Sequence, residues 1–499
     1  MAQPSTATAA PAAAPSPAPS PAPSGAGATA TGAPPSGSAQ PALRGKLGLW
    51  SIVFMVVAAA SPLGVIGGPV PLGIAIGNGA AFPATFVIAA VVLGLFAVGF
   101  TAMTPHVKRA GAFSSYVREG LGKRAGVGTG ISALLTYLTL EAAVYGLLGP
   151  GVQGLVASYG GPDVPWWLWS LVIAAGVAAL GFRNIALSGK VLGALLIAEV
   201  AIVVILDIVV ISTGAGPEGP STAALDPGQV FSGAPGVAIL FALLSFLGFE
   251  ATAVFRDETK DPARTIPRAT FVALGGVALF YAVSSWVLVT ALGQSEAQEE
   301  AGAHADTLLV DLTANYLGPI GAHVVQVLYV TSLLACILSV HHVASRYLFS
   351  LGGQRVLPAR LGVAHAKHGS PANASLAASL VTAAFIIVAA LAQLEPVAQY
   401  YTWVAGFSSV GLVVLLGLTT TAVLRYFGIH PGLVGIWRGR VAPALALLGL
   451  LAFAVLVFQN LPMLVGGSVW LAGVIIGVHV LGFAGGYLFG TRRSAVSAS

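Results

Sequence analysis

Long apolar runs recur along the whole of this 499-residue chain, and they constrain its fold more than any other feature. Each run approaches the ~20 residues with which an α-helix crosses the hydrocarbon core of a bilayer. Only 8% of the residues are charged, whereas ordinary soluble domains carry about 25%. The sequence therefore predicts an all-α integral membrane protein with twelve transmembrane helices. The expected helices cover residues 47–76, 83–105, 127–157, 165–182, 188–213, 235–256, 269–292, 319–350, 372–393, 397–424, 441–460 and 467–490.

The basic residues provide an independent test of this division. If the N-terminus is cytoplasmic and the helices alternate in direction, all 22 Lys and Arg residues fall on the cytoplasmic side. Cytoplasmic loops of membrane proteins carry an excess of Lys and Arg. We therefore expect a multi-pass protein of the cell (cytoplasmic) membrane, embedded in the lipid bilayer, with both termini cytoplasmic. Because the basic residues follow the loops, they do not indicate a nucleic-acid partner.

The first expected helix is interrupted by the segment SPLGVIGGPVP, residues 61–71. Proline removes a helical hydrogen bond and glycine weakens a helix, so we expect the helix to unwind here. Broken helices are tolerated at membrane depth only where they line a cavity within the protein. The second half-helix would direct free N–H groups into that cavity, which suits an anion such as a carboxylate. The alternative is a simple kink without a ligand, because Pro and Gly are common in membrane helices.

The sixth expected helix shows a milder interruption. The segment SFLGF, residues 245–249, places a hydroxyl group and a glycine directly before Glu250. Two interrupted helices at corresponding positions of two halves indicate a secondary transporter with inverted repeats and a binding site at their interface. The expected divisions are a disordered, Ala/Pro/Ser-rich cytoplasmic tail over 1–43, a first five-helix repeat over 44–213, a second, inverted five-helix repeat over 235–424, two peripheral helices over 441–490 and a cytoplasmic tail over 491–499.

Several stretches resemble the amino acid–polyamine–organocation (APC) superfamily of transporters. The most specific is SFLGFE followed by DETKDPARTIPRA at 257–269, which is similar to the family pattern Ser-Phe-x-Gly-x-Glu and Glu-x-Lys-Asn-Pro-x-Arg-x-Ile-Pro-Arg. Supporting stretches are PLGVI at 62–66, AGAFSSY at 110–116 and ASRYLF at 344–349. The resemblance implies a leucine-transporter-type bundle of five-plus-five inverted-repeat helices, with broken helices 1 and 6. It also implies a central site between helices 1, 3, 6, 8 and 10.

The same resemblance implies the positions of the substrate contacts. In family members the substrate carboxylate meets backbone N–H groups of the broken first helix, which are here those of residues 63–65. The substrate amino group would lie near the serine at the break and the backbone carbonyl groups of residues 246–248. The family pattern has Gly-Ser where this chain has Pro62 and Leu63, so the serine at the break would have to supply the missing hydroxyl. The residues implied as substrate contacts are Ser61, Leu63, Gly64, Val65, Phe246, Leu247 and Gly248.

Four acidic residues lie inside the expected helices, and no Lys or Arg lies deep enough to pair with them. A carboxylate at mid-bilayer depth is costly, so each one is a functional hypothesis. Glu250 matches the glutamate of the family's sixth helix and is predicted to be a proton-sensitive gate residue, with a structural, hydrogen-bonded acid as the alternative. Glu199 lies in the fifth helix, near the position of a lysine in proton-coupled relatives, and is predicted to carry the coupled proton. A cation ligand and a structural acid are the alternatives for Glu199.

Glu141 lies four residues after Tyr137 and four before Tyr145, so the three side chains share one face of the third helix. If that face lines the site, Tyr137 and Glu141 meet the substrate, and the carboxylate favours a cationic or amine-bearing side chain. The alternative is a packed, hydrogen-bonded acid. Asp207 lies near the external end of the fifth helix and is expected to reach water.

The remaining patterns exclude several classes of site. The single cysteine, Cys336, permits neither a disulfide nor a Cys-based metal site within the chain. His341 and His342 are adjacent and point to different faces of a helix, so structural or site-lining roles are expected rather than metal binding. Tyr400 and Tyr401 begin the tenth helix and are expected to be interfacial aromatics first and an outer gate second. No Walker motif, nucleotide fingerprint or catalytic triad is present, so we predict neither a cofactor nor an enzyme activity.

These features predict a secondary active transporter of amino acids or related amines. Protons are the expected coupling ion, and alternating access by proton-coupled symport is the expected mechanism. An amino acid or amine exchanger is the main alternative. A non-transporting membrane sensor on the same scaffold is the alternative of another class.

Overall fold

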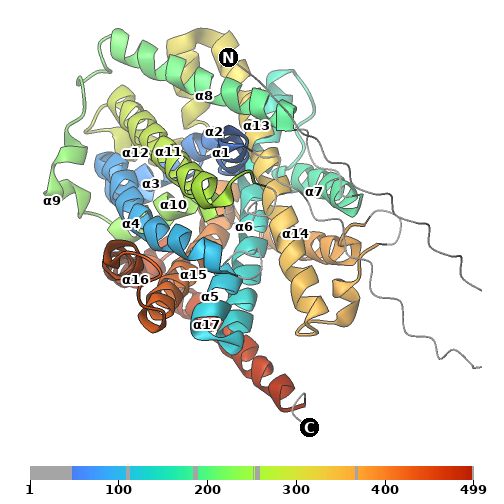
Figure 1. Cartoon of the computed structure of the whole chain (residues 1–499). Helices are drawn as coiled ribbons and strands as arrows, with labels where there is room; N and C mark the ends of the chain where they lie inside the picture. Colours follow the sequence, from blue (N-terminus) through green and yellow to red (C-terminus); the bar gives the residue numbers. More distant parts are fainter. Residues whose placement is uncertain are drawn as a thin grey trace, which may run out of the picture. The chain divides into compact units, whose positions relative to one another are not determined.

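The computed structural model describes residues 48–107, 113–183, 189–250, 252, 259–365 and 369–496, with the main chain alone for 189–190 and 491–496. The part of the chain that it describes is all-helical (Figure 1). The α-helices are α1 (Leu49–Ala59), α2 (Pro62–Gly67), α3 (Pro69–Gly73), α4 (Phe82–Met103), α5 (Phe113–Leu121), α6 (Lys123–Ser158), α7 (Trp166–Phe182), α8 (Gly189–Ser212), α9 (Pro227–Val230), α10 (Pro235–Ser245), α11 (Pro262–Leu292), α12 (Ala297–Ala303), α13 (Leu308–Gly353), α14 (Ala372–Leu391), α15 (Thr402–Ile429), α16 (Ala442–Leu464) and α17 (Val469–Val496). Short π- and 3₁₀-helical turns join them: η1 (Ile74–Asn78), η2 (Gly79–Ala81), η3 (Thr104–His106), η4 (Ala223–Leu225), η6 (Ala359–Gly362), η7 (Pro396–Tyr401) and η8 (Trp437–Val441).

Ten of the described helical segments are long and apolar enough to cross a membrane. Two shorter apolar helices, α7 and α10, coincide with the expected fourth helix and with the first half of the expected sixth. The chain is therefore a multi-pass membrane protein. The count of twelve spans and their division into two inverted repeats stay predictions, and the expected tail over 1–43 lies outside the described residues.

The first expected helix, over residues 47–76, is divided into α1, α2 and α3. α1 ends at Ala59, and Ser61 then has a left-handed backbone conformation (φ 52°, ψ 67°). α2 begins directly afterwards, because Pro62 has a fixed φ and suits the first position of a helix, where no N–H group is needed. Gly68 (φ −127°, ψ −81°) separates α2 from α3. These interruptions lie within the segment whose Pro and Gly residues predicted unwinding.

The sixth expected helix, over 235–256, is shorter than predicted. α10 ends at Ser245, and a turn over residues 246–248 follows it. Gly248 has φ +116° in that turn, a conformation that glycine adopts readily because it has no Cβ. The turn directs the chain away from the axis of α10, so Glu250 does not continue the α10 helix. Residues 251 and 253–258 of the expected exit lie outside the described part.

α6 lies in the middle of the bundle, where it packs against α13, α15 and α17 (Figure 1). Of its most apolar 18-residue window, 89% is buried, whereas the corresponding share is 33% for the span ending in α16 and 22% for α17. A helix that is buried all round belongs to a core, whereas one that exposes apolar side chains can face lipid. The expected third helix is therefore central, and the last two helices lie at the edge of the bundle.

Candidate functional site

A small cavity lies where five segments of the bundle meet. It is enclosed by the break between α1 and α2, by α6, by the end of α10, by α13 and by η7 at the start of α15. These are the first, third, sixth, eighth and tenth of the expected helices. The cavity volume is about 50 Å³, which is far below the several hundred Å³ of typical ligand sites. The lining residues are Ala59, Ala60, Ser61, Gly64, Val65, Pro69, Leu140, Val144, Leu147, Leu244, Ser245, Leu247, Leu333, Cys336, Val340 and Tyr401.

The break between α1 and α2 determines which backbone N–H groups can bind an anion. The Val65 N–H group donates to the Ser61 carbonyl (3.0 Å), and the Leu63 N–H group donates to the Glu199 carboxylate. Of the three N–H groups predicted to meet a carboxylate, that of Gly64 alone has no hydrogen bond within the described residues. A side chain at Gly64 would not fit, because a Cβ there would lie 2.3 Å from Ser61 Oγ. Leu63 is fully buried and does not line the cavity.

A chain of three side chains connects this break to α13 and α8. The Ser332 hydroxyl donates to Glu199 Oε2 (2.7 Å), and Ser61 Oγ lies 2.8 Å from Ser332 Oγ. A hydroxyl group has one hydrogen, so Ser61 must donate to Ser332 when Ser332 donates to Glu199. Glu199 is 4% exposed, and the described residues supply it with hydroxyl and N–H donors but no Lys or Arg. The sequence-predicted residues Ser61 and Glu199 are thus brought together through Ser332, which the sequence did not single out.

The turn that follows α10 closes the cavity from another side. Leu247 lines the cavity, whereas Phe246 and Gly248 do not. Phe246 instead packs its ring edge-on against Phe86 and Tyr281, with centroid distances of 6.2 and 6.1 Å. Only one of the three residues predicted here as substrate contacts therefore faces the cavity in this conformation.

Glu250 is held by the turn in which it lies and by α6. The Tyr137 hydroxyl donates to Glu250 Oε1 (2.6 Å), and the Gly248 N–H group donates to Oε2 (2.9 Å). The Tyr137 ring stacks on that of Tyr347 in α13 at 5.7 Å. Tyr137 and Glu250 are both buried and neither lines the cavity. These contacts connect α6, α13 and the turn after α10 next to the cavity, and the Glu250 carboxylate lies where they meet.

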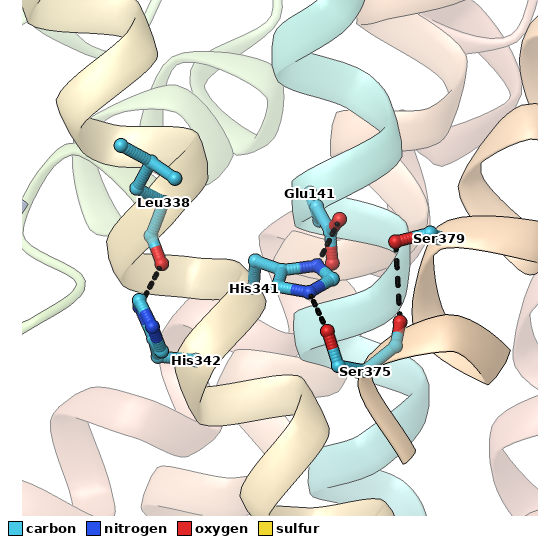
Figure 2. Close-up of polar contacts among 6 residues, drawn as sticks. All are labelled: Glu141, Leu338, His341, His342, Ser375 and Ser379. Carbon is cyan, nitrogen blue, oxygen red and sulfur yellow. Dashed lines mark hydrogen bonds and ion pairs between the residues drawn. The ribbon is translucent and has the colours of Figure 1, made fainter. Parts of the chain in front are cut away.

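Glu141 lies outside the cavity lining and pairs with a histidine (Figure 2). His341 Nδ1 lies 2.8 Å from Glu141 Oε1, and His341 Nε2 lies 2.8 Å from Ser375 Oγ. The side chains of Glu141 and His341 are each 1% exposed. The cluster joins α6, α13 and α14, whereas the ring of His342 turns away to the Leu338 carbonyl of its own helix (2.7 Å). The stripe shared with Tyr137 suggested that Glu141 faces the substrate, but in this conformation Glu141 does not contact the cavity.

The surroundings of this cluster are closely packed and incompletely hydrogen-bonded. Glu141 Oε2 and the Tyr145 hydroxyl are buried without a hydrogen-bond partner among the described residues. Gly181 of α7 packs against the other end of the cluster, where a Cβ would lie 2.4 Å from Ser375 Oγ and 2.8 Å from His341 Nε2. α7 can approach α13 and α14 this closely only because residue 181 has no side chain.

Two expectations about neighbouring residues were wrong. Asp207 is 8% exposed rather than open to water, and its Oδ2 accepts a hydrogen bond from the Ser284 hydroxyl of α11 (2.7 Å). Tyr400 and Tyr401 are each 2% exposed, so their side chains are buried in the protein and do not face lipid headgroups or water. The Tyr400 hydroxyl donates to the Ala142 carbonyl (2.9 Å), and Tyr401 lines the cavity. Both tyrosines belong to the π-helical turn η7, which periodicity does not distinguish from the start of an α-helix.

The rest of the lining carries no sequence signal. Leu140, Val144, Leu333 and Val340 are apolar residues of apolar helices, and only the packing of the helices shows that they face the cavity. Within the described ranges, no group of three or more His, Cys, Asp or Glu side chains could hold a metal ion.

Comparison with known proteins finds a permease family and several transporters. The profile of the family described as amino acid permease matches residues 47–481. An uncharacterized transporter of Mycobacterium tuberculosis (strain ATCC 25618 / H37Rv) is 27% identical over 458 residues, which are 90% of this chain and 92% of the relative. The aromatic amino acid transport protein AroP of Escherichia coli (strain K12) is 26% identical over 348 residues, 65% of this chain and 73% of the relative. The fold resembles that of MhsT, solved in complex with L-phenylalanine, with a TM-score of 0.57 at 17% identity over 81% of this chain and 98% of that one.

Proposed function

The chain belongs to the amino acid permease family, and from that premise we propose that this amino acid transporter is a proton-coupled symporter of the cytoplasmic membrane that works by alternating access. The cavity between α1/α2, α6, α10, α13 and η7 is the proposed substrate site. The proposal extends to twelve spans in two inverted five-helix repeats, with both termini cytoplasmic, as the distribution of Lys and Arg favours. The observation that carries the coupling proposal is the hydrogen-bonded connection from Glu199 through Ser332 to Ser61 at the edge of the cavity.

Proton coupling follows from what surrounds Glu199. Its partners are hydroxyl and N–H groups, so no cation compensates a negative charge on the buried carboxylate. Burial disfavours the charged form, and a proton removes that cost. Leu63 and Ser61 belong to the break that also exposes the Gly64 N–H group to the cavity. Loading a proton on Glu199 and binding a substrate at the break would therefore act on the same few residues.

We propose a revised set of contacts for the substrate backbone. The Gly64 N–H group would hold the carboxylate, because the N–H groups of Leu63 and Val65 already have acceptors. The Ser61 hydroxyl would join it once a proton on Glu199 reverses the two hydroxyl hydrogen bonds, so that Ser332 donates to Ser61 and the hydrogen of Ser61 is free. The amino group would meet backbone carbonyls of the turn over 246–248, next to Leu247. These assignments retain the site implied by the family resemblance and reduce its anion-binding part to one backbone donor and one hydroxyl.

The lining favours an apolar substrate side chain over a cationic one. The wall beyond the break consists of apolar residues from α6, α10 and α13, with the Tyr401 ring on one side. Glu141, on which the expectation of a cationic substrate rested, is paired with His341 outside the lining. We therefore propose apolar or aromatic amino acids as substrates, a choice that the name of the relative AroP also supports.

Tyr137 and Glu250 are proposed to close the inner side of the site. If α6 runs outward from Lys123, Tyr137 precedes the cavity-lining Leu140 and lies nearer the cytoplasm. The short hydrogen bond between Tyr137 and Glu250 would have to break before the turn after α10 can separate from α6. Protonation of Glu250 would weaken that bond, since a charged acceptor binds a hydroxyl more strongly than a neutral one.

Uptake by proteoliposomes tests the proposal. The purified protein is reconstituted, an inside-alkaline pH gradient is imposed, and uptake of labelled phenylalanine, leucine, lysine and putrescine is compared. We expect accumulation of phenylalanine or leucine that a protonophore abolishes and that an imposed sodium gradient does not restore. Gradient-independent uptake that requires amino acid inside the vesicles would identify an exchanger instead. Preferential uptake of lysine or putrescine would refute the assignment of an apolar substrate.

A further inference from the structure

A second, larger pocket lies away from the proposed substrate site. Four elements form it: α5, the start of α6, the segment after α13 and the end of α17. Its volume is about 260 Å³. Arg118 and Lys123 line it together with Gln354, Val356 and Phe489. None of the residues assigned to substrate binding or proton coupling contributes to it.

No described residue compensates the positive charge in this pocket. The side chains of Arg118 and Lys123 form no ion pair and no hydrogen bond with any residue that the structure describes, and no Asp or Glu is among the lining residues. The neighbouring Glu119 forms no ion pair with either cation within the described residues. Two unpaired cations that share one pocket repel each other, so an anion between them would be stabilised by both.

The backbone around the pocket adds to this preference. α6 begins at Lys123 and no side chain caps its N-terminus, so free N–H groups and the positive end of the helix dipole lie beside the two cations. The carbonyl groups at the end of α13 are already occupied: the Arg355 N–H group donates to the Gly352 carbonyl (2.8 Å) and the Val356 N–H group to the Leu351 carbonyl (2.9 Å). Most carbonyl groups at the negative end of α13, which would repel an anion, are therefore already hydrogen-bonded.

The position of the pocket indicates the source of the anion. Two apolar spans, Lys123–Ser158 and Val469–Gly490, begin and end at it. The pocket thus lies at the level where spans leave the hydrocarbon core, and the side on which all Lys and Arg residues are expected is the cytoplasmic one. Phe489 is 49% exposed at its edge and offers an apolar surface beside the charges. We propose that this pocket binds the phosphate group of an anionic phospholipid, whose acyl chains lie along α17.

Lipid binding to the purified full chain tests the proposal without reference to transport. The protein is delipidated in detergent, and retention of phosphatidylglycerol and phosphatidylcholine is compared by native mass spectrometry and by thermal unfolding. We expect selective retention of phosphatidylglycerol and a higher unfolding temperature in its presence. Each of Arg118→Gln and Lys123→Gln should weaken phosphatidylglycerol binding by about fivefold, because one cation near a lipid phosphate contributes on the order of a factor of five in affinity.

Matched variants keep the result interpretable. Arg440→Gln removes an exposed cation of the same expected membrane side but outside the pocket, and should leave binding unchanged. Arg118→Lys and Lys123→Arg preserve the charge and should retain binding, which separates loss of charge from misfolding. Equal retention of both lipids by the wild type, or undiminished binding by the double Gln variant, would overturn the proposal. Competition by inorganic phosphate at lipid-equivalent concentrations would show a soluble-anion site and would also overturn it.

Discussion

Glu199 and Glu141 are carboxylates of the same bundle with similar burial and different partners. Both are at most 4% exposed, and neither contacts a Lys or Arg within the described residues. Glu199 accepts a hydrogen bond from the Ser332 hydroxyl, beside the break between α1 and α2. Glu141 contacts the His341 imidazole, between α6, α13 and α14. One acid adjoins the break between α1 and α2, and the other joins α6, α13 and α14.

The different partners of the two carboxylates suggest different roles for them. Serine hydroxyl groups do not gain or lose a proton near neutral pH. Protonation of Glu199 therefore changes the net charge of its surroundings by one. The Glu141 carboxylate and the His341 imidazole form a buried pair, which the Ser375 hydroxyl extends on the far side of the ring. Loss of either partner would leave the other buried without its hydrogen bond, which is costly. We therefore expect Glu199 to govern ion coupling and Glu141 to govern stability.

The largest effect that tests this comparison is expected for a substitution of His341. His341→Ala leaves the Glu141 carboxylate buried without its partner, which should lower the free energy of unfolding by about 3–5 kcal/mol. Thermal unfolding of the purified variant measures the loss. Glu141→Gln keeps a hydrogen-bonding group of the same size and should cost less. An unchanged unfolding temperature for His341→Ala, or loss of proton-driven uptake in a variant that stays folded, would contradict the structural role.

Gly181 tests the same cluster through packing. Gly181→Ala would place a Cβ 2.4 Å from Ser375 Oγ and 2.8 Å from His341 Nε2, and overpacking of this kind costs about 1–3 kcal/mol. Gly176 lies on the same helix, and a Cβ at that position would have nothing within 4 Å. Gly176→Ala should be neutral or slightly stabilising, since Ala is the better helix former. Equal unfolding temperatures for the two variants would show that α7 does not pack closely on the cluster.

Glu199→Gln should change coupling without a comparable loss of stability. With one proton per substrate, a gradient of one pH unit supports about tenfold accumulation, equivalent to about 1.4 kcal/mol. The variant cannot cycle its proton and should lose this tenfold accumulation while it retains substrate binding and exchange. Uptake and counterflow in proteoliposomes measure the two quantities separately. Wild-type accumulation by Glu199→Gln would move the coupling site elsewhere and remove the distinction between the two acids.

The smallest expected effect is at the hydroxyl between Glu199 and the break. Ser332→Ala removes a donor to Glu199 and the acceptor of Ser61, and one hydrogen bond contributes about 1 kcal/mol. We expect about fivefold weaker apparent substrate affinity in uptake assays. Ser339 lies on the same helix, and among the described residues its hydroxyl bonds only to the Ala335 carbonyl. Ser339→Ala should therefore behave as the wild type, and an equal effect of both variants would argue against the serine connection.

Most helical elements of the fold could be predicted from the sequence, because they depend on the chemistry of neighbouring residues. Apolar runs marked the spans, the Pro and Gly residues over 61–71 marked the division of the first run, and the glycine of SFLGFE marked the turn after α10. The family motifs pointed to the correct superfamily. Each of these signals belongs to one contiguous segment, which is why it survives without knowledge of the packing.

The contacts between helices could not be predicted from the sequence. Glu141 was expected either to face a substrate or to be a packed, hydrogen-bonded acid, and its partner His341, 200 residues away in sequence, could not be predicted. Asp207 was expected to reach water, and the packing of α11 buries it beside Ser284. Periodicity shows which side chains share a helix face, but the direction of that face depends on how the helices assemble. The roles of the predicted site residues stay predictions that the uptake and stability experiments address.

The cavity of about 50 Å³ has a consequence for every affinity measured on this protein. If this cavity is the substrate site, a phenylalanine or leucine would not fit in it, and the protein would first have to adopt a wider conformation. The observed dissociation constant then equals the intrinsic one divided by the fraction of molecules in that conformation. If about 1% of the molecules are wide enough, the apparent affinity is about a hundredfold weaker than the contacts alone would give. Substitutions far from the cavity that favour the wider conformation would tighten binding without adding a single contact to the substrate.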